Sequence, residues 1–149
     1  MFVNNVSSFS QYFLLLILLL FLSCSTISKF DQYTYSQAIS IKVDALSLMD
    51  SATQNYQQHQ RAVAQINTSI DKIYEYEKNR PKNTISEKMW AMIRDTTGTL
   101  YGRFIKRWQR EGTLDTAFIL ESKRLIGQSF DQISQLESGK IKADQTVNQ

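Results

Sequence analysis

The scarcity of turn residues and the spacing of apolar side chains together predict an all-α protein. The 149-residue chain has five glycines and one proline, and neither type occurs between Cys24 and Arg80. A β-sheet protein would need a turn residue about every 8 to 12 positions. Apolar side chains instead recur at intervals of three and four residues, which is typical of amphipathic helices. We expect a long antiparallel helical hairpin or a three-helix bundle over residues 36–139, after an N-terminal signal segment.

The first helix is predicted over residues 36–79. Its apolar residues recur every seven positions, at Met49, Tyr56, Val63 and Ile70, and the intervening positions hold Ala45, Ala52, His59, Ile66 and Ile73. This pattern predicts a narrow seam that packs against another helix at a shallow crossing angle. Pro81 ends the helix, because proline disfavours helical geometry in the residue before it and has no backbone N–H to donate.

His59 is the single histidine of the chain, and it falls on the predicted seam. It could be a pH-sensitive or metal-binding residue, or a partly buried polar residue that sets the register between helices. The positions three and four residues away hold Asn55, Tyr56, Ala62 and Val63, which do not bind metals as carboxylates, thiols or imidazoles do. The sequence therefore favours a structural role and predicts no metal site.

A second helix is predicted over residues 85–110, antiparallel to the first after a turn at 79–83. Thr84 and Glu87 match a capping box at its start. The helix contains both tryptophans, Trp90 and Trp108, which predicts that it lies at the centre of the core. Gly98 and Gly102 lie four residues apart, and we expect a bend or a close backbone contact there instead of a complete break.

One face of the second helix carries a basic strip, formed by Arg103, Lys106, Arg107 and Arg110. The opposite face carries Tyr101, Phe104 and Trp108. The strip is either an ordinary solvated face, with Glu111 and Asp115 close enough to pair with it, or a contact site for an anionic partner. Such a partner could be lipid headgroups, an anionic envelope polymer or an acidic protein.

A third helix is predicted over residues 114–138. Gly112 has the position of a residue that ends the second helix, and Thr113 or Asp115 could cap the next one. Gly139 ends the third helix, and residues 140–149 form a polar, flexible tail. If Gly112 only kinks the chain, the second and third helices merge and the fold becomes one long hairpin.

The N-terminal segment is strongly apolar but short. From residue 12 to residue 22 the tyrosine hydroxyl is the one polar side-chain group, and polar residues stand on both sides. About 11 helical residues span about 16 Å, whereas a transmembrane helix needs about 20 residues. This length favours a secretory signal over residues 1–23. Cys24 follows directly and is the single cysteine of the chain.

The sequence Phe21-Leu22-Ser23-Cys24 resembles the lipobox of bacterial lipoprotein signal peptides. The resemblance covers the first 24 residues, and it implies that Cys24 receives a lipid and becomes the N-terminus after cleavage. Residues 24–35 would then form the lipidated cysteine and its tether. Ser25 after the cysteine resembles the residues that direct many such proteins to the outer membrane, facing the periplasm. An uncleaved signal-anchor with a free thiol and plain secretion are the alternatives.

The remaining sequence contains no catalytic motif. A net charge of +3 is too small to indicate a nucleic-acid partner, and no cysteine follows Cys24 to form a disulfide. Phosphate-binding loops, H-E-x-x-H and Cys/His clusters are absent from the sequence. We expect a non-enzymatic cell-envelope lipoprotein without a cofactor or small-molecule substrate, whose helical domain is a binding or structural subunit. The alternatives are a subunit of a larger envelope assembly and a single-pass, non-lipidated membrane protein.

Overall fold

The computed structural model describes residues 30–141, and this part of the chain is helical throughout, without a β-strand. Its helices are α2 (Gln32–Asp50), α3 (Gln60–Lys78), α4 (Thr84–Arg94), α5 (Tyr101–Glu111) and α6 (Thr116–Glu137), with short 3-10 turns η1 (Ser51–Thr53) and η2 (Tyr56–Gln58). The all-α prediction is confirmed. The predicted signal segment, Cys24 and most of the C-terminal tail lie outside the described residues.

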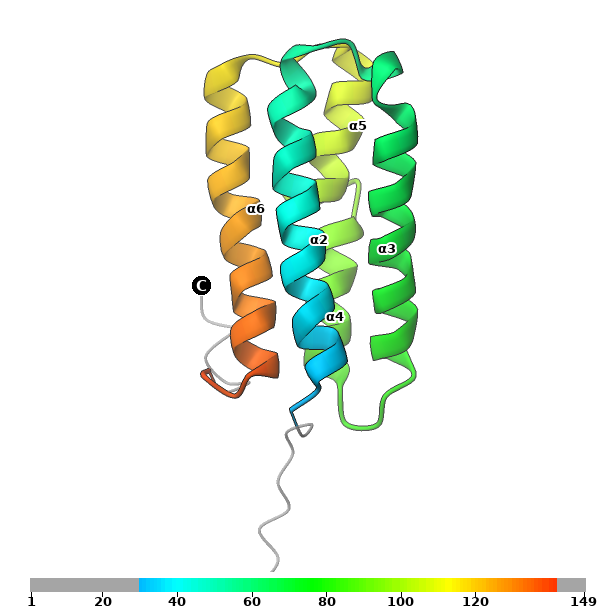
Figure 1. Cartoon of the computed structure of the whole chain (residues 1–149), viewed down its shortest axis with the longest axis vertical. Helices are drawn as coiled ribbons and strands as arrows, with labels where there is room; N and C mark the ends of the chain where they lie inside the picture. The colour runs from blue at the N-terminus through cyan, green and yellow to red at the C-terminus, as the bar shows by residue number, and fades with distance from the viewer. Residues whose placement is uncertain (1–29, 142–149) are drawn as a thin grey trace, which may run out of the picture.

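The helices form an up-down-up-down bundle of four rods (Figure 1). Helix α2 lies between α3 and α6, and α4 and α5 follow one another along the fourth rod. We call the end where α2 begins the entry end; the 79–83 turn and the end of α6 also lie there. The opposite end, with residues 51–59 and 111–115, is the far end.

The prediction of one continuous helix over residues 36–79 is wrong. The structure has two helices there, α2 and α3, which run antiparallel. Gln54 and Asn55 adopt extended backbone conformations between the two 3-10 turns, and the Asn55 side chain accepts a hydrogen bond from the Gln57 amide. The seam residues nevertheless become buried, since Ala45, Met49 and Ala52 pack in the same core as Val63 and Ile70 from the returning helix. The apolar spacing therefore continues through a turn that contains neither glycine nor proline.

The helix start predicted at residue 36 is late by four residues. Helix α2 begins at Gln32, inside the segment assigned to the tether, and Asp31 caps it by accepting a hydrogen bond from the Thr34 amide at 2.9 Å. The capping box predicted at Thr84 is also wrong. Thr84 is the first helical residue of α4, and Asn83 occupies the cap position without a side-chain hydrogen bond to the helix.

The second predicted helix is interrupted completely, in contrast to the bend that we expected. Helix α4 ends at Arg94 and α5 starts at Tyr101. The close contact expected at a glycine is confirmed at Gly102, where an added Cβ would lie 2.3 Å from the Arg94 carbonyl oxygen. Such a contact is impossible for any residue with a side chain, so Gly102 allows the start of α5 to pack on the end of α4.

The third predicted helix agrees closely with α6. Gly112 ends α5 with a φ of 80°, a left-handed conformation that favours glycine, and Asp115 caps α6 through the Phe118 amide. The second and third helices are therefore separate. The core is formed by the apolar sides of all five helices, and both tryptophans are fully buried in it, as predicted.

Candidate functional site

The basic strip lies on the outer surface of α5. Arg103, Lys106 and Arg110 are exposed and Arg107 is partly buried. Tyr101, Phe104 and Trp108 point from the other side of α5 into the core, as the sequence predicted. The structure therefore gathers the four basic side chains on one face of a single short helix.

The members of the strip differ in how their charges are used. Arg107 donates from Nε to both carboxylate oxygens of Glu111 at 3.1 Å, and Arg110 donates to the same carboxylate at 2.7 Å. Hydrogen bonds from Arg110 and Arg107 lower the pKa of Glu111. Within residues 30–141, Arg103 and Lys106 form no ion pair closer than 4.0 Å. The positive charge that no ion pair neutralises therefore lies on Arg103 and Lys106, in the half of the strip nearer to α4.

A groove of about 580 Å³ runs beside the strip, between α5 and α6. The Arg107 guanidinium lies 3.9 Å above the Phe118 ring, and that ring stacks on Phe104 at 5.9 Å between centroids. Leu125, which is exposed on α6, also lines the groove. Glu111 and Glu121 line the groove as well, but both carboxylates are paired with arginines. The groove thus offers cationic groups beside an apolar wall, which suits a ligand that has an anionic group next to an apolar one.

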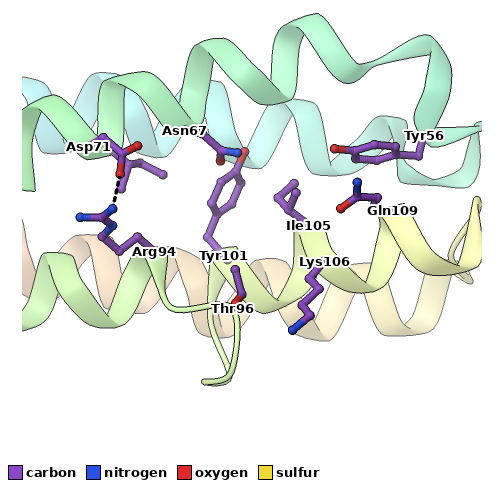
Figure 2. Close-up of a pocket in the computed structure, with 11 residues that line it drawn as sticks. Tyr56, Asn67, Asp71, Arg94, Thr96, Tyr101, Ile105, Lys106 and Gln109 are labelled. Atoms are coloured by element: carbon purple, nitrogen blue, oxygen red, sulfur yellow. Dashed lines mark ion pairs between the residues drawn. The ribbon is translucent and has the colours of Figure 1, made fainter.

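A second hollow, a cleft of about 420 Å³, lies between α3 and the junction of α4 with α5 (Figure 2). The Tyr101 side chain reaches from α5 toward Asn67 on α3, and an ion pair of 2.9 Å joins Asp71 to Arg94 beside it. The Tyr101 hydroxyl is buried and forms no hydrogen bond with another group of the described chain. Burial raises the pKa of Tyr101, so the hydroxyl stays protonated and can donate to a water or a small acceptor in the cleft.

The entry end holds a cluster of buried polar side chains that no sequence prediction anticipated. Arg80, in the 79–83 turn, lies at its centre and donates from Nη1 to Glu77 at 3.1 Å and to Glu137 at 3.3 Å. Thr34 donates to the Glu77 carboxylate and Ser86 donates to the Glu137 carboxylate. We call these five residues the polar cluster; its members come from α2, α3, α4, α6 and the turn, so it joins all four rods.

Electrostatics in the polar cluster are dominated by burial. Glu77 is fully buried, and burial raises its pKa, against the opposing effects of the Thr34 hydrogen bond and the Arg80 charge. Nearby Glu137 raises it further. Arg80 also lies 3.6 Å from Asp31, and Asp31 accepts a hydrogen bond from the Tyr76 hydroxyl at 2.9 Å. The polar groups are mutually satisfied, so the cluster holds the rods together and presents no reactive group.

A signal for the polar cluster was present in the sequence. Glu77 stands four and seven residues after the seam positions Ile73 and Ile70, and Glu137 stands four residues after Ile133. A carboxylate at an apolar position predicts a buried, paired charge. The identity of its partner could not be read, because Arg80 and Glu137 are 57 residues apart.

His59 does not lie on a continuous helical seam. It is the residue between η2 and α3 at the far end, where its ring lies 5.4 Å from the Trp108 ring and its Nε2 is 2.8 Å from the Gln54 side-chain oxygen. In residues 30–141, no group of three or more histidine, cysteine, aspartate or glutamate side chains is arranged to bind a metal ion.

The anchor prediction concerns Cys24, which lies outside the described residues. None of the helices in the described part combines the length and apolar character needed to cross a membrane. Compared with protein-family models, with curated proteins and with solved structures, the chain has no match.

Proposed function

We propose that the protein is a cell-envelope lipoprotein, anchored through a lipid on Cys24, whose helical bundle acts as a binding or structural subunit and not as an enzyme. The observation that carries this proposal is the position of the single cysteine. It closes an apolar segment too short to span a bilayer, and only six residues separate it from Asp31, where the folded bundle begins. Ser25 favours the outer membrane, facing the periplasm.

The short connection limits how far the bundle can move from the membrane. Seven residue steps from Cys24 to Asp31 reach about 25 Å even when fully extended. Helix α2, with 19 residues, is itself about 28 Å long. The entry end is therefore the part of the bundle nearest the bilayer, and the far half, where α5 carries the basic strip, is the part best placed to meet another component of the envelope.

Metabolic labelling with a fatty acid tests the anchor. Wild-type protein and a Ser23→Ala control, which keeps a small residue before the cysteine, are expected to incorporate the label. Cys24→Ala is expected to incorporate none and to keep its N-terminal segment. Equal labelling of all three proteins, or labelling of none, contradicts the proposal. Intact wild-type protein that begins at Met1 and has a free thiol supports the single-pass, non-lipidated alternative.

The partner of the strip is proposed to be anionic, a protein or an envelope polymer. Arg103 and Lys106 supply charge that no ion pair neutralises in the described part of the chain, and the groove beside them adds an apolar wall. Crosslinking in the native envelope, followed by identification of the captured molecule, tests this. Arg103→Gln with Lys106→Gln is expected to abolish the crosslink, whereas Arg61→Gln, which removes an exposed charge from α3, leaves it unchanged. Equal capture by both variants contradicts a role for the strip.

A subunit of a larger envelope assembly is the second candidate. The seam over residues 45–73 is buried within the chain's own bundle and is not open to another chain. Ile39 and Val43, however, are exposed one turn apart on α2, and they form a small apolar surface. Mass measurement of the detergent-solubilised protein separates the candidates, because a monomer contradicts self-assembly through this surface.

A further inference from the structure

The exposed aromatic side chains of the described part gather at the entry end. Phe30 stands two residues before the start of α2, Tyr33 lies in the first turn of α2 and Tyr76 lies in the last turn of α3. Their side chains are 60%, 48% and 39% exposed, whereas every other aromatic residue between 30 and 141 is buried or half-buried. Exposed aromatic rings concentrated at one end of a helical bundle indicate a contact surface, because folding alone gains nothing from their exposure.

These rings are held in place by the fold. Tyr33 and Tyr76 meet edge to face with their centroids 4.9 Å apart, and Phe30 lies 6.2 Å from Tyr35. The Tyr76 hydroxyl donates to Asp31, the residue that caps α2. The rings therefore have fixed positions beside the point where the chain leaves toward Cys24.

Charges around the rings favour an anionic contact. Lys82 and Lys140 are exposed, one in the 79–83 turn and one just after α6, and Lys78 is exposed at the end of α3. Asp31, Glu77 and Glu137 face Arg80 inside the bundle. Glu75 lies 3.8 Å from Lys78, and Glu87 is half-buried in the first turn of α4. Lys82 and Lys140 thus supply outward positive charge that no ion pair offsets in the described part of the chain, and Lys78 is partly offset by Glu75. Most carboxylates of this end are turned inward.

We infer that the entry end docks directly on an anionic lipid surface, with Phe30, Tyr33 and Tyr76 at the headgroup level and the lysines on the headgroups. Aromatic rings prefer this interfacial layer, and basic residues near it are attracted to anionic lipids. The inference rests on the proposed lipid anchor, which holds this end within about 25 Å of the bilayer. The bundle then stands upright on the membrane and presents its far half to the periplasm.

The test uses the full, lipidated chain in vesicles that contain anionic lipid and lipids with a quencher at the headgroup. Gln32→Cys and Gln57→Cys each add one thiol for an environment-sensitive fluorophore, because Cys24 is consumed by its lipid. Gln32 lies at the entry end and Gln57 at the far end, and both are exposed. We expect quenching and a blue shift at position 32 and neither at position 57. Equal signals at the two positions contradict docking.

A longer tether separates docking from mere proximity. About twenty Gly and Ser residues inserted between Ser28 and Lys29 would let an undocked bundle move well away from the membrane. If the entry end binds lipid, position 32 remains quenched in this variant. If the tether alone held it there, the quenching at position 32 falls to the level of position 57, and the inference is wrong.

Charge variants test whether the lysines attract the entry end to anionic lipid. Lys78→Gln with Lys82→Gln is expected to lower the docking equilibrium about fivefold per lysine on anionic vesicles and to change little on neutral ones. The matched control, Arg61→Gln with Arg124→Gln, removes the same charge elsewhere and leaves docking unchanged. Equal losses contradict a specific surface. Protein that floats with vesicles but shows no quenching overturns this inference alone, whereas protein that does not float overturns the lipid anchor as well.

Discussion

At the entry end, four polar side chains from four helices surround Arg80, whereas the far end is closed by backbone hydrogen bonds and aromatic rings around Trp108. There the Tyr56 amide donates to the Gly112 carbonyl and the Leu114 amide donates to the Ala52 carbonyl, each at 2.8 Å. The Trp108 indole nitrogen donates to the Gln54 carbonyl at 3.0 Å. Both ends join the same rods, but only the entry end does so with buried charges.

Buried charges make the entry end the more vulnerable part of the bundle. A buried carboxylate is tolerated only while its partner remains, and loss of one member of a buried ion pair leaves an uncompensated charge. The buried contacts described for the far end are made by neutral groups, so a substitution there loses only packing and single hydrogen bonds. The entry end should therefore be more sensitive to single substitutions and to pH than the far end.

The largest effect is expected for Arg80→Ala. It leaves Glu77 and Glu137 buried without their cation, which should lower the free energy of unfolding by about 3–5 kcal/mol. Urea denaturation measures this change. Arg110→Ala, which removes an exposed arginine, serves as the control and should change stability by less than about 0.5 kcal/mol. Similar losses in the two variants would show that the polar cluster contributes little.

Trp108→Phe probes the far end. The smaller ring leaves a gap in the core and removes the hydrogen bond to the Gln54 carbonyl, so we expect a loss of about 2 kcal/mol. The same denaturation experiment measures it. A loss greater than that of Arg80→Ala would reverse the ranking of the two ends.

Asp31 caps α2 at the entry end and Asp115 caps α6 at the far end, so the same substitution can be compared at both ends. Asp115→Ala removes one hydrogen bond to the start of α6 and should cost about 1 kcal/mol. Asp31→Ala removes the equivalent bond in α2 and also the contacts with Tyr76 and Arg80, which should add about 1 kcal/mol. Equal losses would mean that the contacts of Asp31 beyond its cap do not stabilise the fold.

The contributions of Glu77 and Glu111 to the free energy of unfolding should change with pH in opposite directions. This is the smallest effect expected. Burial raises the pKa of Glu77, so its contribution to stability is complete below about pH 4 and falls as the pH rises through the folded-state pKa. Hydrogen bonds from Arg110 and Arg107 lower the pKa of Glu111, so its contribution is present above about pH 4 and is lost as the pH falls.

Unfolding of the wild type, Glu77→Gln and Glu111→Gln between pH 3 and pH 7 tests these signs. The stability of the wild type relative to Glu77→Gln should decline as the pH rises. Its stability relative to Glu111→Gln should increase over the lower part of the same range. Slopes of the same sign for both variants would contradict the assignment for Glu77.

Signals that act within a short stretch of chain were readable in the sequence. The helical class, the turn at Pro81, the end of α5 at Gly112 and the cap at Asp115 each depend on the conformational preference of one residue or on local spacing. The apolar segment before Cys24 is also a local signal: its length predicts a secretory signal, and its resemblance to a lipobox implies the lipid anchor. Both stay predictions, because these residues lie outside the described part of the chain. These features need no knowledge of what packs against them.

Tertiary packing alone decided the rest. Residues 51–59 turn the chain back although their apolar spacing is that of one continuous helix, because the core accepts the seam equally well from two antiparallel helices. Gly102 became essential only when α5 packed against the Arg94 carbonyl. The partners of Glu77 and Glu137 were likewise set by the meeting of distant segments. Periodicity records which side of a helix is buried, but not which segment buries it, since many partners satisfy the same apolar stripe.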